Sequence, residues 1–311
     1  MIGITVRRTI SRVIVITLLL IGSFSVESLI IIDGNRQFSL DLEDLAEHEQ
    51  VLWETNRERD GRDRIDWWSG VLLDDILASL QIRNHHQLRF ASLDKYQIRL
   101  TVEELKDHPA LIALKRNDLT LSENNLRLVI PGLRDMFWIQ GLDVIQVEDY
   151  QQMPLPDVIY FAEDLINEIL FKKNSLSDQK ERDISFTELI SSVYPVLQEE
   201  FLLIARDGIS HRLDFETYLN SGFLIRDDKG YNLQSPDMPI GMWIKNLAYI
   251  QFFDRAIIFR DQFTNLSAVK ILLDWSEVPE RLWTDNSCII DPDLDFSDPI
   301  WINCGKILWP K

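Results

Sequence analysis

The sequence predicts a mixed α+β fold that is rich in β-sheet. Short runs of alternating apolar and polar residues recur along the chain, and turn-forming residues bound them. Short amphipathic segments with helical spacing stand between these runs. The 311 residues suit one large domain or two small ones, and an apolar fraction of 46% excludes a disordered chain.

The first half of the chain alternates between expected strands and short helices. In chain order, the pattern predicts two strands in 29–40, a helix in 41–49, a strand in 51–55, a charged loop in 56–66, a tight turn at Ser69 and Gly70, a helix in 72–80, a hairpin in 87–101, a helix from Val102, and strands within 119–132 and 137–149.

Residues 150–183 differ in character and are expected to form a helix and a linker. The apolar side chains of 158–170 fall on one helical face, which predicts a helix over 157–172 with Asp157 as its N-cap. The polar stretch 174–183 predicts the linker. We expect the helix to pack on its own domain, and a partner-binding helix is the alternative.

The pattern of the first half returns after residue 184, in the same order of elements. At a constant offset, four residues of the first hairpin region recur in the second half: Asp94, Arg99, Leu100 and Glu103 match Asp207, Arg212, Leu213 and Glu216. Trp138 likewise matches Trp243. We interpret this as a diverged internal duplication, with a first copy in 29–149, a shorter second copy in 184–260 and a tail in 261–311.

Residues 29–149 resemble the molybdopterin-binding domain of sulfite-oxidase-type oxidoreductases. The resemblance depends on the order of several stretches: "IIDG…FSLDLEDL", "WWSGVLLDDIL", "FASLDKYQIRLTVEEL", "LRLVIPG" and "FWIQGLDVIQVED". It implies a sheet-rich α+β fold of the sulfite-oxidase type. It also implies the chemistry of that family, in which a cysteine thiolate binds molybdenum.

The resemblance places that cysteine in the segment "VLWETNRERDGRDRID", which contains Glu54, Thr55 and Asn56 but no cysteine. Oxygen side chains replace a soft thiolate ligand poorly. Phe137 stands where the family tends to carry a lysine, whereas Arg127 matches a basic position of the family. Arg127, Thr55 and Asn56 are therefore the candidate cofactor-binding residues. We expect no catalytic residue, no metal ligand and no cofactor, with bound molybdopterin as the alternative.

The N-terminus has the order of charges and apolar residues that is typical of a secretory signal. Arg7, Arg8 and Arg12 precede the apolar run 13–24, and the small residues Ser25 and Ser28 follow it. We expect a signal peptide over 1–28 and a periplasmic or otherwise exported protein. An uncleaved anchor is the alternative and would be the chain's contact with a membrane.

Cys288 and Cys304 are the two cysteines of the chain. In an exported protein their expected state is a disulfide, which would close a short loop rich in Asp and Pro. The adjacent histidines His85 and His86 are expected in a loop rather than in a metal site. The motifs HExxH and GxSxG and a glycine-rich phosphate-binding loop are missing from the sequence.

The net charge of −18 argues against nucleic acid as a partner. The first hypothesis is an exported, non-catalytic binding module that senses a small-molecule ligand or engages an envelope protein. The second is a molybdopterin-dependent oxidoreductase with atypical metal ligation. The third is a structural or assembly protein that acts through the helix at 157–172 and the Trp-rich tail.

Overall fold

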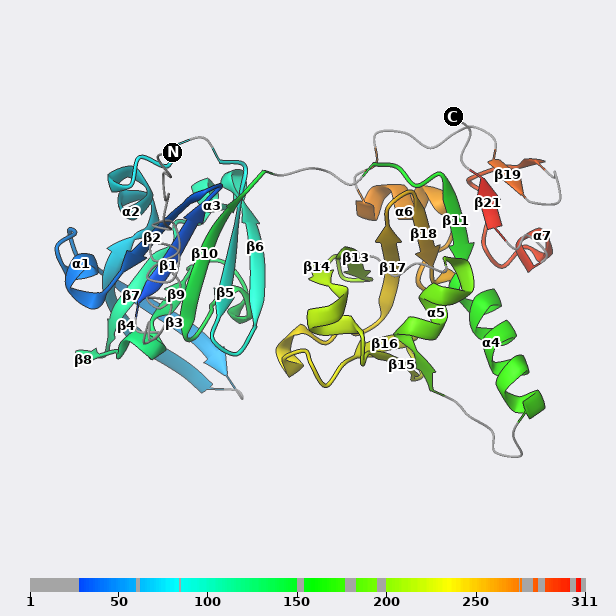
Figure 1. The fold of residues 1–311 in the computed structure, drawn as a ribbon, viewed down its shortest axis with the longest axis horizontal. Helices are drawn as coiled ribbons and strands as arrows, with labels where there is room; N and C mark the ends of the chain where they lie inside the picture. The colour runs from blue at the N-terminus through cyan, green and yellow to red at the C-terminus, as the bar shows by residue number, and fades with distance from the viewer. Residues whose placement is uncertain are drawn as a thin grey trace, which may run out of the picture.

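A computed structural model describes most of the chain between residues 28 and 308. The described ranges are 28–59, 62–83, 85–149, 154–176, 183–194, 200–273, 275, 282–284, 289–302 and 306–308. The predicted signal segment before Ser28 and the predicted Cys288–Cys304 disulfide lie outside these residues. Two domains follow one another along the chain (Figure 1).

Two sheets and three short helices build the N-terminal domain. The first sheet has the strand order β2-β1-β10-β5-β6, and the second has the order β3-β4-β7-β8, with β9 paired to β7. Strand bounds are β1 Leu29–Asp33, β2 Arg36–Leu40, β3 Val51–Arg59, β4 Arg62–Leu72, β5 Gln87–Ser92, β6 Gln97–Thr101, β7 Leu111–Arg116, β8 Leu119–Thr120, β9 Arg127–Val129 and β10 Leu142–Glu148. The helices are α1 Leu42–Ala46, α2 Leu73–Ser79 and α3 Val102–Asp107, with 3-10 turns η1 Glu123–Asn125 and η2 Asp135–Phe137.

The core of this domain lies between the two sheets and is apolar. Ile31, Phe90 and Ile145 from the first sheet and Trp68 and Ile112 from the second are fully buried in one cluster. Burial of such side chains is the main stabilising contribution to folding. The sheet-rich α+β architecture that the sequence predicted is confirmed.

The C-terminal domain contains an eight-stranded and a three-stranded sheet among its described residues. Their orders are β14-β13-β17-β18-β11-β21-β19-β20 and β12-β15-β16. The strands are β11 Val158–Phe161, β12 Ile184–Ser185, β13 Glu200–Ala205, β14 Ser210–Asp214, β15 Phe223–Arg226, β16 Tyr231–Gln234, β17 Leu247–Phe252, β18 Arg255–Ile258, β19 Leu282–Thr284, β20 Ile289–Ile290 and β21 Lys306–Leu308. The helices are α4 Ala162–Leu176, α5 Phe186–Val193, α6 Leu266–Leu273 and α7 Pro299–Ile302, with short turns η3 Phe215–Leu219, η4 Ile240–Met242 and η5 Arg260–Gln262.

Three local predictions were wrong. The expected charged loop 56–66 belongs mostly to β3 and β4, which pair in register with Arg57 opposite Arg64. The expected turn at Ser69 and Gly70 lies inside β4, at an irregularity in its pairing with β7. The expected helix at 157–172 begins only at Ala162, because Val158–Phe161 forms β11 between β18 and β21. Asp157 therefore does not cap that helix.

The segment expected to link the two copies contributes to the C-terminal core. Ala162 and Ile166 of α4 are buried in the same cluster as Phe186 of α5 and Phe201 of β13. Strand β11 and the tail strand β21 also lie in the same sheet as β13 and β14. The helix thus packs on its own domain, as expected.

The matched residues of the two halves make corresponding hydrogen bonds. The indole of Trp138 donates to the carbonyl of Ile130 at 2.8 Å, and that of Trp243 donates to the carbonyl of Ser235 at 3.1 Å, eight residues earlier in each case. The amide of Leu128 donates to Ile139, and that of Leu233 donates to Ile244. These correspondences support the predicted duplication.

Within the described parts of the chain, no helix combines the length and the apolar composition needed to cross a membrane.

Candidate functional site

The candidate site is a cavity of about 630 Å³ lined by four arginines of the N-terminal domain, with Gly241 of the C-terminal domain also in its lining. Arg57 comes from β3, Arg64 from β4, Arg116 from β7 and Arg127 from β9. Strand pairing brings these residues together, because β4 lies between β3 and β7 and β9 also pairs with β7. The other polar lining residues include Asp94, Tyr96, Asp135 and Gln140.

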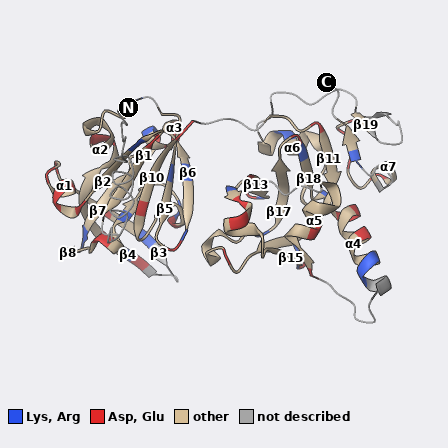
Figure 2. Ribbon diagram, viewed as in Figure 1, with Lys and Arg blue, Asp and Glu red and all other residues tan. Residues whose placement is uncertain are grey.

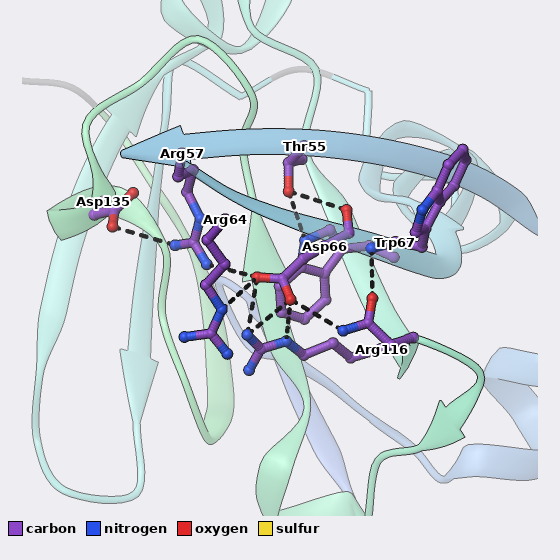
Figure 3. Close-up of polar contacts among 9 residues, drawn as sticks. Thr55, Arg57, Arg64, Asp66, Trp67, Arg116 and Asp135 are labelled. Atoms are coloured by element: carbon purple, nitrogen blue, oxygen red, sulfur yellow. Dashed lines mark hydrogen bonds and ion pairs between the residues drawn. The ribbon is translucent and has the colours of Figure 1, made fainter. Parts of the chain in front are cut away.

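A buried carboxylate holds three of the four arginines in place. Asp66 on β4 is 1% exposed. It accepts hydrogen bonds from Arg116 at 2.8 and 2.9 Å, from Arg57 at 3.2 Å and from the Asn117 side chain at 3.1 Å. Arg64 lies 3.3 Å from the same carboxylate. Figure 3 shows this arrangement around Asp66.

The protonation state of Asp66 follows from these contacts. Burial by itself raises the pKa of the carboxyl group, but the hydrogen bonds from Arg116, Asn117 and Arg57 outweigh burial and lower the pKa below its ordinary value. Asp66 is therefore ionised at neutral pH. Arg57 also pairs with Asp135 at 3.2 Å, at the rim of the cavity.

Arg127 is held differently from the other three arginines. Its Nε is buried and has no hydrogen-bond partner among the described residues, and its guanidinium lies over the ring of Trp68 at 5.4 Å. Burial, together with repulsion from Arg57 and Arg116, lowers its pKa to about 10. Arg127 stays charged at neutral pH, so it is a half-buried cation with unused donor capacity. An anion in the cavity would supply the missing acceptor.

Two tryptophans support the arginines from the core. Arg116 lies over Trp68 at 5.0 Å, and Arg57 lies over Trp138 at 4.4 Å. The Trp68 indole donates to the hydroxyl of Thr55 at 2.9 Å, which fixes the ring. The guanidinium planes are therefore held in position before any ligand arrives.

The three candidate cofactor-binding residues have different places. Arg127 lines the cavity. Thr55 is buried below it, where its hydroxyl accepts from Trp68 and donates to the Asp66 carbonyl at 3.3 Å, so it supports the site without lining it. Asn56 is exposed, because successive side chains of β3 point to opposite faces of the sheet.

Sequence reasoning missed Arg57, Arg64, Asp66 and Arg116. The signal that would have found them lies in "NRERDGRDRID". If this stretch forms a hairpin, Arg57 and Arg64 are paired, and Arg64 and Asp66 are two residues apart on one strand, so all three side chains point to the same face. Figure 2 shows basic and acidic residues close together in this part of the domain.

The donors of the cavity are chemically suited to an oxyanion. Guanidinium groups bind phosphate and carboxylate oxygens through paired N–H donors. They do not bind a molybdenum ion. The family resemblance implies a thiolate ligand for that ion, so the residues present do not fit the metal part of a molybdopterin cofactor. Among the described residues, no group of three or more His, Cys, Asp or Glu could hold a metal ion.

Comparison with known proteins gives a family match for the N-terminal domain. Residues 30–154 match the model of the oxidoreductase molybdopterin binding domain. Among solved structures, the chain is similar to the sulfane dehydrogenase SoxCD from Paracoccus pantotrophus, at 16% identity and a TM-score of 0.35. That match covers 41% of this chain and 40% of the SoxCD chain. The search of curated proteins gave no match.

Proposed function

We propose that this chain, which carries an oxidoreductase molybdopterin binding domain over residues 30–154, is a non-catalytic module that binds a small oxyanion. The single observation behind the proposal is Arg127, a half-buried guanidinium at the cavity, whose buried Nε finds no acceptor in the described parts of the chain. Leaving a buried charged donor unpaired is costly, so an anionic ligand would stabilise it. In the predicted exported protein, such binding would serve as ligand sensing or as a signal to an envelope partner.

Substituting Arg127 tests the proposal directly. We expect wild-type protein to bind inorganic sulfate, phosphate or pyrophosphate in calorimetric titrations, and Arg127→Met to lower that affinity about 10- to 100-fold, the value of one charge-assisted hydrogen bond. Arg36→Met is the matched control, because Arg36 lies outside the cavity and pairs at the surface with Asp33. Equal losses in both variants, or no binding by the wild type, would contradict the proposal.

The pH dependence of binding gives a second prediction. Since the Arg127 pKa is about 10, the cation is fully present below about pH 9 and is lost as the pH rises through 10. We expect the affinity for sulfate, which stays a dianion throughout, to be constant from pH 6 to 9 and to fall above that range. A lysine in the same surroundings starts from a pKa of about 10.4 instead of 12.5 or more, so Arg127→Lys should lose binding about two pH units earlier. Identical profiles for both proteins would show that another group controls binding.

The competing proposal of an oxidoreductase has its own test. The protein would be produced in a host able to make molybdopterin, and the same sample would be measured for molybdenum and for fluorescence of oxidised pterin. Stoichiometric molybdenum would overturn the non-catalytic proposal. Pterin without metal would identify the anion as the phosphate of a pterin, and the absence of both would leave the oxyanion proposal as it stands.

A further inference from the structure

Tyr96 connects the arginine cavity to the C-terminal domain. Its hydroxyl donates a hydrogen bond at 2.6 Å to the carbonyl of Met136, in the turn η2 at the cavity. Its ring lies beside Gly241 in the turn η4, where an added Cβ would stand 3.0 Å from Cε2 of Tyr96. Met136 and Gly241 are matched residues of the two copies, since they stand at the same spacing as Trp138 and Trp243. Corresponding turns of both copies therefore meet at one side chain.

The neighbours of Tyr96 are part of the contact between the domains. The backbone amide of Gln97 donates to Sδ of Met242 at 3.4 Å, so strand β6 is held directly to η4. Arg134, the residue before η2, pairs with Asp207 of the C-terminal domain at 3.7 Å. A displacement of η2 would therefore change the contacts that both Arg134 and Tyr96 make with the C-terminal domain.

Arg57 holds the carboxylate of η2 only loosely. Figure 3 shows its guanidinium between Asp66 and Asp135. It donates a hydrogen bond to the buried Asp66 at 3.2 Å, whereas its contact with Asp135, also at 3.2 Å, is an ion pair without a hydrogen bond. The Asp135 side chain is 59% exposed, and exposed ion pairs contribute little because water screens them. Asp135 is thus an anion that a better ligand could displace.

The arginines keep donors that such a ligand can use. The Nε of Arg57, like that of Arg127, is buried and has no acceptor in the part of the chain that the structure describes. Both guanidinium groups line the same cavity. A tetrahedral oxyanion carries several acceptor oxygens, so it can satisfy donors of both arginines at once. The carboxylate of Asp135 is fixed to η2, and its ion pair is with Arg57.

We propose that Asp135 competes with the oxyanion for Arg57, and that its displacement loosens the contact between the domains at Tyr96. When the ligand takes over Arg57, η2 moves and carries the Met136 carbonyl away from the Tyr96 hydroxyl. The Tyr96 ring then loses its fixed position beside Gly241. The inference rests on the proposed oxyanion site and adds how occupancy of that site reaches the C-terminal domain. Because such coupling is reciprocal, docking of the C-terminal domain lowers the affinity for the oxyanion.

Sulfate titrations of two charge-neutral variants test the competition. Asp135→Asn should raise sulfate affinity about two- to fivefold, the value of an exposed ion pair. Asp94→Asn removes the same charge from the cavity lining and measures the general electrostatic effect, because Asp94 accepts from the Tyr96 amide at 3.2 Å and from the Ser92 hydroxyl instead of from an arginine. We expect the smaller gain for Asp94→Asn. Equal gains in both variants would overturn the inference.

Hydrogen exchange of the Gln97 amide tests the transmission, because this amide donates to Met242 of the other domain. NMR would follow its exchange rate in the full chain at saturating sulfate and in chloride of equal ionic strength. We expect sulfate to speed Gln97 exchange severalfold in the wild type. The effect should be largely lost in Tyr96→Phe, which lacks the hydroxyl that donates to Met136.

The outcomes separate this inference from the oxyanion proposal. The amide of Ile82, which donates to Leu77 within the N-terminal domain, is the control for exchange. Sulfate binding with unchanged or slower Gln97 exchange would overturn the inference and leave the oxyanion site standing. Absence of sulfate binding would contradict the oxyanion proposal, and the inference with it. At a sulfate concentration that just saturates the wild type, Arg127→Met should respond less, and a full response would show that sulfate acts elsewhere and overturn the inference.

Discussion

Replacing Asp66 by alanine is expected to lower the free energy of unfolding by about 3–5 kcal/mol, the cost of removing one partner from a buried ionic group. Three arginines and the Asn117 amide converge on this carboxylate, which is 1% exposed. Without it, Arg57 and Arg116 repel each other beside the core tryptophans. The expected change exceeds that of a surface ion pair severalfold.

Urea denaturation of Asp66→Ala, compared with wild type, measures this change. Asp63→Ala is the matched control, because Asp63 is an exposed acid on the same strand. The double variant Asp66→Ala/Arg116→Met should recover part of the loss, since it also removes one of the uncompensated charges. Equal effects of Asp66→Ala and Asp63→Ala would show that the buried carboxylate does not organise the site.

The contacts of Asp66 also predict how the free energy of unfolding depends on pH. The Asp66 pKa is lowered in the folded protein, so its contribution is fully present above the unfolded value of about 3.9 and is lost as the pH falls through the folded value. The difference in stability between wild type and Asp66→Ala should therefore shrink below about pH 4.

Sequence patterns predicted the elements in which local and tertiary signals agree. The hairpin of β5 and β6 and helix α3 formed as expected. In the structure, Asp94 forms the turn of the hairpin and Thr101 caps α3. Helix α5 is confirmed as well, and it has the same type of cap at Ser185. In these segments periodicity, turn residues and capping residues favour one structure.

The sequence misled where tertiary contacts reverse a local preference. Val158–Phe161 continues the apolar helical face of α4, yet these residues lie between β18 and β21, where the sheet buries Ile159 and Phe161. The charged stretch 56–66 lacks apolar alternation because one face of the β3–β4 hairpin carries Arg57, Arg64 and Asp66, and the other faces solvent. Its charges compensate one another only after β7 supplies Arg116, and a single sequence does not show which strands are neighbours.

The candidate site, like the fold, was predictable from the sequence only in part. Arg127 was found because the resemblance marked its position, whereas Arg57, Arg64 and Arg116 required the order of strands. Thr55 lies under the site because it supports Trp68, a role that depends on a hydrogen bond across the strand pair β3–β4. One of the three candidate cofactor-binding residues, Arg127, thus lines the cavity, and the donors at that cavity are guanidinium groups and not a thiolate.

Gly70→Ala is the second substitution with a large expected effect. It concerns a glycine that the sequence placed in a turn and the structure places in a strand. Gly70 lies within β4, where an added Cβ would stand 2.1 Å from the carbonyl oxygen of Ile112 and 2.7 Å from Cα of Ala113. Both atoms belong to the backbone of β7, so no side-chain movement relieves the clash. The glycine is required because two strands approach closely, which is one of the few uses of glycine inside a sheet.

Because β7 carries Arg116, displacement of β7 would disturb the core and the arginine cavity together. We expect Gly70→Ala to cost at least about 3 kcal/mol of stability, the upper range for overpacking, and to weaken oxyanion binding in the same protein. Gly34→Ala is the matched control: Gly34 has φ of +58° and no atom within 4 Å of an added Cβ, so only backbone strain of about 1–2 kcal/mol is expected there. Thermal unfolding of the two variants separates the causes. A Gly70→Ala protein no less stable than Gly34→Ala would mean that β4 and β7 are not packed as closely as described, and that Gly70 serves the turn that its sequence suggested.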